Sequence, residues 1–389
     1  MLQDFRTEVR QWLEANCPAS MRTPIVEEEE VWGGSQEKFK NPDSKIWLER
    51  MAAKGWTAPE WPKAYGGGGL SPQEAMVLKE EMNKLGCRPA LLSFGIWMLG
   101  PVLLQYGTEE QKKRHLPKIA RGEIRWCQGY SEPAAGSDLA SLGTRAEAVG
   151  DQFVINGSKV WTSYADASDW IFCLVRTDFN VSKQQGISFM LIDMHQPGVK
   201  VEPIRLISGA SPFCEVFFKD VKTSKDNLIG PLNGGWQIAK ALLTHERQAI
   251  SEINKKPSEL PLDIIAKQKL ATRDGRIADE HYRQRLAAWH MDNTAFELTL
   301  ERETSLQKAG HSPGPASSMF KLYGTELNKR KYELMMEAIG FQSLVWEGTD
   351  EARERQAVRD WLRSKGNSIE GGTSEIQLNV IAKRVLGLP

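Results

Sequence analysis

Several features that would direct a chain toward nucleic acid, a membrane or secretion are missing from these 389 residues. Basic and acidic residues balance at 50 each, which argues against nucleic acid or an anionic membrane as a partner. All apolar runs fall short of the roughly 18 residues that a membrane helix needs. Residues 1–18 carry acids early and have no apolar core, so we expect no secretory signal.

Cysteine and histidine are too few and too scattered for a disulfide framework or a metal centre. The five cysteines have no paired spacing, which predicts reduced thiols in a soluble cytoplasmic protein. The six histidines form no cluster with cysteine or carboxylate, so we predict no metal site.

The periodicity of the apolar residues predicts an α+β protein with three domains. Residues 1–125 have helical spacing, residues 126–228 alternate like strands, and residues 229–389 return to helical spacing. Within the last domain, residues 252–282 are polar and poorly periodic, and we predict a loop there.

Capping residues mark one helix especially well. Ser71 followed by Glu74 is typical of a helix N-terminus, and Gly86 is typical of a helix end. Further helices are predicted at residues 44–54, 109–115, 283–309 and 316–339 and near the C-terminus.

Four consecutive glycines, Gly66–Gly69, resemble a phosphate-binding loop in composition only. No Gly-Lys-Ser/Thr follows them, and no strand clearly precedes them. We therefore interpret this stretch as a turn-rich connection.

Residues 126–163 organise the rest of the chain. The stretch passes through SEPAAGSD and then alternates around a Val-Gly-Asp turn and Asn156-Gly157, which predicts antiparallel hairpins. Small residues in the SEPAAGSD turn allow backbone N–H groups to approach a ligand closely. Trp161 can supply an aromatic face, and Ser131 and Ser163 can supply polar contacts. The pattern therefore suits a planar cofactor with polar edges.

A long, ordered match connects this stretch to a known family. The flavin-binding middle domain of the acyl-CoA dehydrogenase family resembles YSEPAAGSDLASLGTRA, followed by INGSKVWTS and ADASDW. The preceding QYGTEEQKKRHLPKIARGE extends the resemblance toward the N-terminus. The resemblance implies an acyl-CoA dehydrogenase-like fold, with an N-terminal helical domain, a middle β-barrel-like domain and a C-terminal four-helix bundle.

The resemblance also implies a reaction and its partners. FAD would be the cofactor, and an acyl-CoA thioester would be oxidised to its trans-2-enoyl form. An electron-transfer flavoprotein would accept the electrons. The assembly would be a homo-tetramer, a homo-dimer or a heteromer with a related subunit.

The base that removes the α-proton is not at the family's most common position. Aligning the usual Tyr-Glu-Gly-Thr motif on Gly372-Thr373 places Gly371 where the glutamate normally stands. A bacterial subgroup carries this glutamate on the first helix of the C-terminal domain, just before an arginine, and Glu246 matches that position. We predict Glu246 as the base, with Glu370 as the reserve candidate.

Another stretch matches the usual motif only by coincidence. Trp346-Glu347-Gly348-Thr349 is closer to it in letters, but a run of charges follows. The TSEIQ continuation belongs to the later copy, so we reject Glu347.

Position by position, the resemblance implies further contacts. The residues implied to bind the cofactor are Tyr130, Ser131, Gly136, Ser137, Trp161, Ser163, Arg273, Thr373 and Glu375. Those implied to bind substrate are Ser137, Thr244, Arg247 and Gly371. The backbone N–H of Gly371 and a ribityl hydroxyl of the flavin would form the oxyanion hole.

Two departures from the family pattern leave other hypotheses open. The usual Arg-x-x-Phe-Gly stretch, which reaches the flavin of a neighbouring subunit, has become residues 271–275, where Arg273 is a weak substitute. The usual Gln-x-x-Gly-Gly run resembles residues 337–341 only in outline. A non-catalytic or half-site subunit of a heteromeric dehydrogenase therefore stays open. So does an acyl-CoA oxidase that passes electrons to oxygen.

Overall fold

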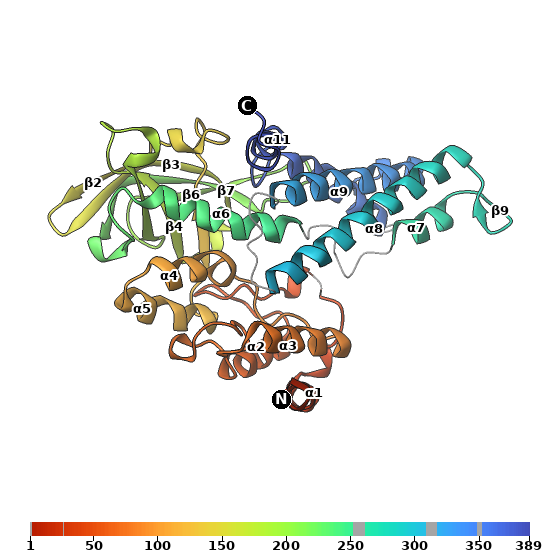
Figure 1. Cartoon of the computed structure of the whole chain (residues 1–389), viewed down its shortest axis with the longest axis horizontal. Helices are drawn as coiled ribbons and strands as arrows, with labels where there is room; N and C mark the ends of the chain where they lie inside the picture. Colours follow the sequence, from red (N-terminus) through yellow and green to blue (C-terminus); the bar gives the residue numbers. More distant parts are fainter. Residues whose placement is uncertain (1, 26, 252–260, 309–316, 348–351) are drawn as a thin grey trace. The chain divides into compact units, whose positions relative to one another are not determined.

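The chain folds into two compact units (Figure 1). A computed structural model describes residues 2–25, 27–251, 261–308, 317–347 and 352–389, without the side chains of residues 27, 244–251, 304, 307–308 and 352–353. The first unit comprises Met1–Ile204 and Pro212–Leu242, and the second comprises Arg205–Ser211 and Leu243–Pro389. Among the described residues, no helix combines the length and the apolar character that crossing a membrane requires.

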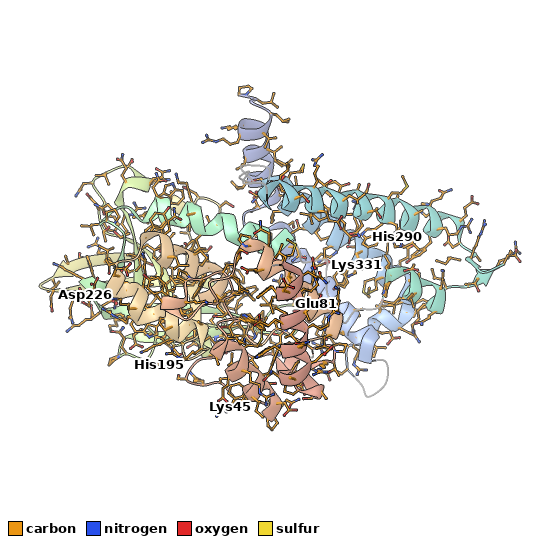
Figure 2. All side chains as sticks on the ribbon, turned by 60° about the horizontal axis from the view of Figure 1, so that its bottom comes forward. Lys45, Glu81, His195, Asp226, His290 and Lys331 are labelled. Atoms are coloured by element: carbon orange, nitrogen blue, oxygen red, sulfur yellow. The ribbon has the colours of Figure 1, made fainter. Side chains whose placement is uncertain are left out.

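The first unit begins with helices, and the first three of them share an apolar core. The helices are α1 Leu2–Asn16, α2 Pro42–Ala53, α3 Pro72–Leu85, α4 Gly100–Tyr106 and α5 Glu109–Ala120. Helices α1 and α3 are joined through Glu81 (Figure 2), whose buried carboxylate accepts hydrogen bonds from Arg10, Lys84 and Arg6. Arg10 and the two other cations lower the pKa of Glu81 to about 2.

The predicted capping of α3 is confirmed. The Ser71 hydroxyl accepts a hydrogen bond from the Glu74 N–H, and the Glu74 carboxylate accepts one from the Ser71 N–H at 2.8 Å. Gly86 then ends the helix with φ 71°, a conformation that costs glycine little.

Helix α5 is longer than predicted. It continues past His115 to Ala120 although Pro117 lies inside it. Leu116 and Ile119 are fully buried, and this packing outweighs the one hydrogen bond that proline cannot donate.

The glycine run 66–69 packs against a tryptophan of the same unit. A β-carbon on Gly67 would lie 2.2 Å from the backbone oxygen of Trp61, and one on Gly100 would lie 1.9 Å from the Trp61 ring. The absence of side chains at these positions allows Trp61 to be buried between the connection and α4.

An eight-stranded sheet follows in the first unit. Its strands are β1 Trp126–Gly129, β2 Arg145–Val149, β3 Gln152–Ser163, β4 Trp170–Arg176, β5 Ile187–Asp193, β6 Val199–Ile204, β7 Phe213–Ser224 and β8 Leu228–Ile229. The hydrogen-bonded order is β6-β7-β3-β2-β4-β5-β8, with β1 parallel to β4. Buried side chains from these strands form the β core, including Phe153, Ile155, Ile171, Met190 and Val216. All five cysteines of the chain are free and buried.

One of the two predicted hairpin turns is wrong. Strands β2 and β3 do turn at Gly150-Asp151, as the alternation indicated. Asn156-Gly157, however, lies inside β3, where the register against β7 shifts between Ile155 and Gly157. A β-carbon on Gly157 would lie 2.7 Å from Thr144, so the glycine serves a bulge and a close backbone approach rather than a turn.

The second unit consists of helices around α9. Helix α6, Gly235–Ser251, belongs to this unit from Leu243 onward. The others are α7 Leu262–Lys269, α8 Glu280–Lys308, α9 Ser317–Ile339, α10 Ala352–Ser364 and α11 Ser374–Val380, with a hairpin of β9 Thr272–Arg273 and β10 Arg276–Ile277 (Figure 1). Helix α9 contacts α7, α8, α10 and α11.

The loop predicted for residues 252–282 is wrong from residue 261 onward, and residues 252–260 lie outside the described residues. Helix α7 and the hairpin occupy this segment because Leu262, Ala266 and Ile277 are buried in the core of the unit. Each piece is too short for its period to stand out from the polar residues around it. The predicted helices at 283–309 and 316–339 correspond to α8 and α9.

Candidate active site

The SEPAAGSD turn is attached to β3 beside Trp161. The Val160 N–H donates to the backbone oxygen of Ser131 at 2.9 Å, and Glu132 and Ala135 exchange backbone hydrogen bonds at 3.1 and 3.0 Å. The Lys159 ammonium donates to the backbone oxygen of Tyr130 at 3.2 Å. The structure therefore brings Tyr130 and Ser131 next to the strand segment that carries Trp161.

A buried ion pair that sequence reasoning missed holds this turn. The Lys159 ammonium lies 2.7 Å from the Glu132 carboxylate, and the Lys159 side chain is fully buried. The same carboxylate accepts hydrogen bonds from the N–H groups of Gly143 and Thr144 at 2.7 and 2.9 Å. Burial alone would raise the pKa of Glu132, but Lys159 and these N–H groups outweigh it and lower the pKa.

Trp161 is exposed by a local irregularity of β3. The register against β7 shifts between Lys159 and Thr162, and both of these residues point into the core. Trp161 lies between them with φ 60°. This left-handed conformation is energetically unfavourable for any residue that has a β-carbon. Its side chain is 56% exposed and meets the Phe213 ring edge-on at 6.1 Å. The bulge thus presents an aromatic face at the surface of the first unit.

The remaining implied positions of the first unit differ in how far they are exposed. Ser163 is half-buried and opposite Phe213 on β7. Gly136 and Ser137 are exposed, and a β-carbon on Gly136 would meet nothing within 4 Å. The fold itself therefore does not require glycine at position 136.

The positions implied near the C-terminus lie together in the second unit. Gly371 and Gly372 both have left-handed φ, 64° and 95°, immediately before α11. Thr373 caps that helix by accepting a hydrogen bond from the Ile376 N–H at 3.2 Å. Glu375 is exposed in the first turn, where its own backbone N–H and the Thr373 hydroxyl lower its pKa.

The three candidate bases, Glu246, Glu370 and Glu347, differ in their surroundings. Glu246 lies in α6, but its side chain and those of Thr244 and Arg247 are outside the described residues. Glu370 is held by Arg363 at 2.6 Å through one carboxylate oxygen and by the Asn367 amide through the other. Both oxygens of this carboxylate are therefore already engaged by side chains of its own segment. Glu347 is exposed, so no dry pocket surrounds it.

Arg273 stands apart from these positions at the tip of a hairpin. It is exposed in β9, and Asp274 and Gly275, with φ 51° and 74°, form the turn to β10. Two successive left-handed residues are typical of a tight hairpin turn, so local backbone geometry accounts for Asp274-Gly275.

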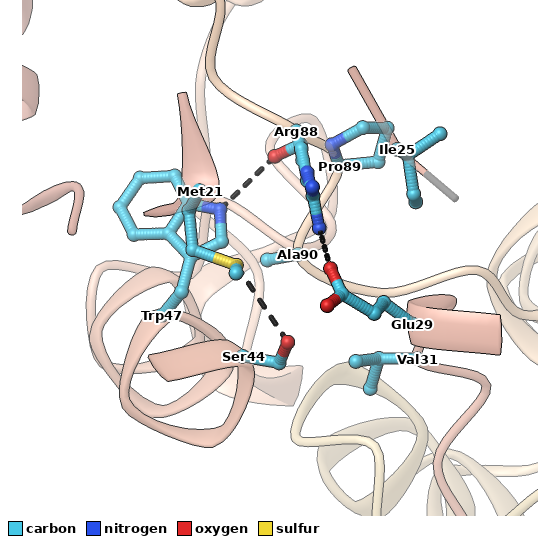
Figure 3. Close-up of a pocket in the computed structure, with 9 residues that line it drawn as sticks. All are labelled: Met21, Ile25, Glu29, Val31, Ser44, Trp47, Arg88, Pro89 and Ala90. Carbon is cyan, nitrogen blue, oxygen red and sulfur yellow. Dashed lines mark hydrogen bonds and ion pairs between the residues drawn. The ribbon is translucent and has the colours of Figure 1, made fainter. Parts of the chain in front are cut away.

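The first unit also encloses a small hollow (Figure 3). It holds about 10 Å³, roughly the room of one water molecule. The Arg88 guanidinium beside it is paired with Glu29 and donates to the backbone oxygens of Thr23 and Pro24. This hollow is a packing feature and does not accommodate an organic ligand.

The chain is thus ordered as helices, then a β-sheet that carries an exposed aromatic face, then further helices. Comparison with known families gives the same order along nearly the whole chain. Residues 2–123 match the N-terminal domain of acyl-CoA dehydrogenase, residues 127–221 its middle domain and residues 233–386 its C-terminal domain. The chain belongs to the acyl-CoA dehydrogenase family and is an oxidoreductase, which confirms the resemblance and the α+β fold class.

Individual relatives and solved structures agree with this assignment. The acyl-CoA dehydrogenase IpdE1 of Mycobacterium tuberculosis is 37% identical over 100% of this chain and 98% of its own. The solved structure of the Tcur3481-Tcur3483 steroid ACAD matches with a TM-score of 0.79 at 29% identity, over 100% of this chain and 97% of that one. The ChsE4-ChsE5 complex from M. tuberculosis matches with a TM-score of 0.75 at 27% identity and the same coverage.

The residues of the first unit fit a flavin. An isoalloxazine has an extended aromatic face and a polar edge, and the exposed Trp161 ring and the Ser131 and Ser163 hydroxyls are complementary groups. The open space around Gly136 allows the backbone to approach a phosphate or a ring edge closely.

Proposed function

We propose that this protein is an FAD-dependent acyl-CoA dehydrogenase that converts an acyl-CoA thioester to the trans-2-enoyl-CoA, with Glu246 as the base. The observation that carries the proposal is the bulge in β3, which exposes Trp161 beside the SEPAAGSD turn. An exposed tryptophan does not contribute to the apolar core, and its left-handed backbone conformation is unfavourable. Its exposed ring suits stacking on a planar cofactor. Membership of the family supplies the reaction type.

The residues of the first unit are proposed to bind and orient the flavin. Trp161 packs against the ring, Ser131 and Ser163 reach its polar edge, and Gly136 and Ser137 contact the pyrophosphate and the substrate. When bound, FAD supplies an acceptor at N5 for the β-hydrogen, which leaves as hydride. Lys159 and Glu132 keep the turn in place for this purpose.

The residues of the second unit are proposed to act on the thioester. Glu246 removes the α-proton, and Thr244 and Arg247 contact the substrate. The backbone N–H of Gly371 donates to the thioester oxygen, on which negative charge develops as the α-proton leaves. Within the described part of the chain, no group accepts a hydrogen bond from this N–H, so the donor is available.

We place the base on α6 because residue 371, at the family's usual base position, carries no carboxylate. Gly371 has no carboxylate, and its φ of 64° disfavours any side chain there. Glu370 is tied to Arg363 and Asn367. Glu246 is the remaining candidate that matches the helix-borne position of the bacterial subgroup. Thr373 and Glu375 are proposed to contact the flavin, and Arg273 to contact a flavin across a subunit boundary.

We further propose that the protein works with a related subunit on a bulky acyl group. Two solved structures that it resembles are described as pairs of different chains, Tcur3481-Tcur3483 and ChsE4-ChsE5. The first of these is described as a steroid ACAD, which favours a ring-containing acyl-CoA as substrate. An electron-transfer flavoprotein is the proposed electron acceptor.

Expression with riboflavin, alone and together with a candidate partner chain, tests this function. We expect a yellow protein that oxidises at least one acyl-CoA in a panel of straight, branched, dicarboxylic and steroid-derived thioesters, with an artificial electron acceptor. Little peroxide should form under air, whereas an oxidase would release it in proportion to substrate consumed. A colourless protein in both preparations would contradict the proposal.

A further inference from the structure

A lysine is buried at the centre of the second unit, where the proposed chemistry does not use it. Lys321 on α9 is 0% exposed. Its ammonium donates to the backbone oxygen of Asn367 at 2.9 Å and to that of Gly372 at 2.8 Å. Burial lowers the pKa of Lys321, so the protein bears a cost to keep an ammonium at this place.

Both carbonyl partners of Lys321 come shortly before α11: Asn367 lies in a 3-10 helix, Lys365–Ser368, and Gly372 lies in the turn that leads into α11. The Gln377 amide donates to the backbone oxygens of Gly371 at 3.0 Å and Gly372 at 3.3 Å. The Asn328 amide donates to the side-chain oxygen of Asn367 at 2.8 Å. The turn is therefore held by buried side chains from α9 and α11.

The residue before Gly371 is fixed as well. The Glu370 N–H donates to the backbone oxygen of Gly366 at 3.0 Å, and its carboxylate is bound by Arg363 and Asn367. Gly371 thus lies between a fixed residue on one side and two fixed carbonyl groups on the other.

Two adjacent glycines would otherwise make this turn mobile. Glycine reaches left- and right-handed conformations about equally well, so Gly371-Gly372 has little preference of its own. Each peptide unit is planar, and holding the carbonyls of Gly371 and Gly372 therefore fixes the planes on either side of Gly372. The hydrogen bond of the Glu370 N–H fixes the plane before Glu370. The Gly371 N–H lies in the single peptide plane between these fixed units, so both limit its direction.

We propose that Lys321 and Gln377 are positioning residues for the thioester oxygen: they hold the Gly371-Gly372 turn so that the Gly371 N–H points at the charge that develops during α-proton removal. This inference rests on the proposed function, since it needs Gly371 as an oxyanion donor. An oxyanion donor stabilises charge only when its direction is set beforehand, and an error of about 1 Å is costly.

Three variants test the proposal. Lys321→Met and Gln377→Leu each remove donors to the turn with little change in volume. Lys331→Met is the matched control, because Lys331 is also a buried lysine of α9, beside Tyr332 and about 15 Å further along the helix (Figure 2). Flavin content and circular dichroism establish that each variant folds, and Gln377→Leu keeps the test valid if Lys321→Met does not fold.

The first readout is hydrogen exchange of the peptide that spans residues 369–376, measured by mass spectrometry without substrate. We expect about tenfold faster exchange in Lys321→Met and Gln377→Leu, and unchanged exchange in Lys331→Met.

The second readout reports on the oxyanion site itself and uses acetoacetyl-CoA as the probe. Its methylene group lies between two carbonyls and loses a proton to give an enolate that absorbs in the ultraviolet. We expect wild type to lower the pH at which half of the bound probe is ionised, relative to free probe. In Lys321→Met and Gln377→Leu the bound enolate should be about tenfold less favoured, a rise of about one pH unit in the midpoint. A purely structural role would change the melting temperature without changing this midpoint.

The outcomes separate the two proposals. Wild type that binds flavin but leaves the ionisation of the probe unchanged would overturn the proposed oxyanion role of Gly371, and the inference with it. A clear shift in wild type that persists unchanged in both folded variants would overturn only the positioning role of Lys321 and Gln377.

Discussion

The ammonium group of Lys159, fully buried in β3, lies 2.7 Å from the carboxylate of Glu132 in the turn that follows β1. Burying an ammonium is costly, and the Glu132 carboxylate offsets that cost with an opposite charge at hydrogen-bond distance. The pair therefore couples the core of the β-sheet to the turn in which we place the flavin.

Removing the negative partner should destabilise the β-domain and release flavin. In Glu132→Gln the Lys159 charge stays buried without a carboxylate, which is expected to cost about 3 kcal/mol in the free energy of unfolding. The control is Glu147→Gln, because Glu147 forms an exposed pair with Arg145 in the same domain, and it should change stability by less than about 0.5 kcal/mol. Chemical unfolding and flavin absorbance measure both effects. Equal behaviour of the two variants would show that the buried pair has no special role.

Trp161 should matter for the cofactor and not for folding. Its side chain is more than half exposed, so Trp161→Ala should change the stability of the flavin-free protein by less than about 1 kcal/mol. Loss of a stacked aromatic face should weaken flavin binding about tenfold.

Phe179→Ala is the matched control, since Phe179 is 53% exposed in the same unit and should leave flavin binding unchanged. Fluorescence titration of the flavin-free proteins measures the dissociation constants. Undiminished affinity in Trp161→Ala would contradict the stacking role.

His115 should make the protein sensitive to mild acid. It is buried against Trp126 and Trp170, and neither ring nitrogen finds a partner among the residues that the structure describes. Burial lowers the pKa of His115 from 6.5 to about 4. Between these values the unfolded chain binds the proton and the folded chain does not, so stability falls as the pH falls from about 6.5 to about 4.

The shift corresponds to a loss of about 2 kcal/mol between pH 7 and pH 5. His115→Phe cannot take up a proton and should show a correspondingly smaller drop in melting temperature over this interval. Parallel drops in wild type and variant would mean that other groups cause the acid sensitivity.

Strong local signals made part of the fold predictable. The Ser71–Glu74 box and Gly86 are satisfied within a few residues of chain, so their outcome depends little on the rest of the protein. Helices α8 and α9 are long, and their bounds agree with the predicted ranges to within three residues.

Features that depend on distant contacts were not predictable in this way. Helix α10 was not predicted: the charged run 350–353 stands at its start, and the packing of Ala357, Val358 and the half-buried Trp361 appears only in the folded chain. Asn156-Gly157 has the composition of a hairpin turn, and pairing with β7 along both sides of it makes it a bulge.

The buried lysines that support the candidate site are harder to recognise in the sequence than the SEPAAGSD motif. Lys159 occupies an inward position of an alternating strand, and Lys321 occupies the buried stripe of α9 together with Thr325 and Asn328. A polar residue at such a position indicates a buried partner, but the partners, Glu132 and the Gly372 carbonyl, are fixed only by the folded chain.

The role of Glu246 as the base is tested most directly by the rate of thioester oxidation by Glu246→Gln. The account predicts that this variant keeps its flavin, still binds thioester and loses activity by a factor of about 10³ or more, whereas Glu347→Gln, at the exposed coincidental motif, retains full activity. Full activity in Glu246→Gln would contradict the account.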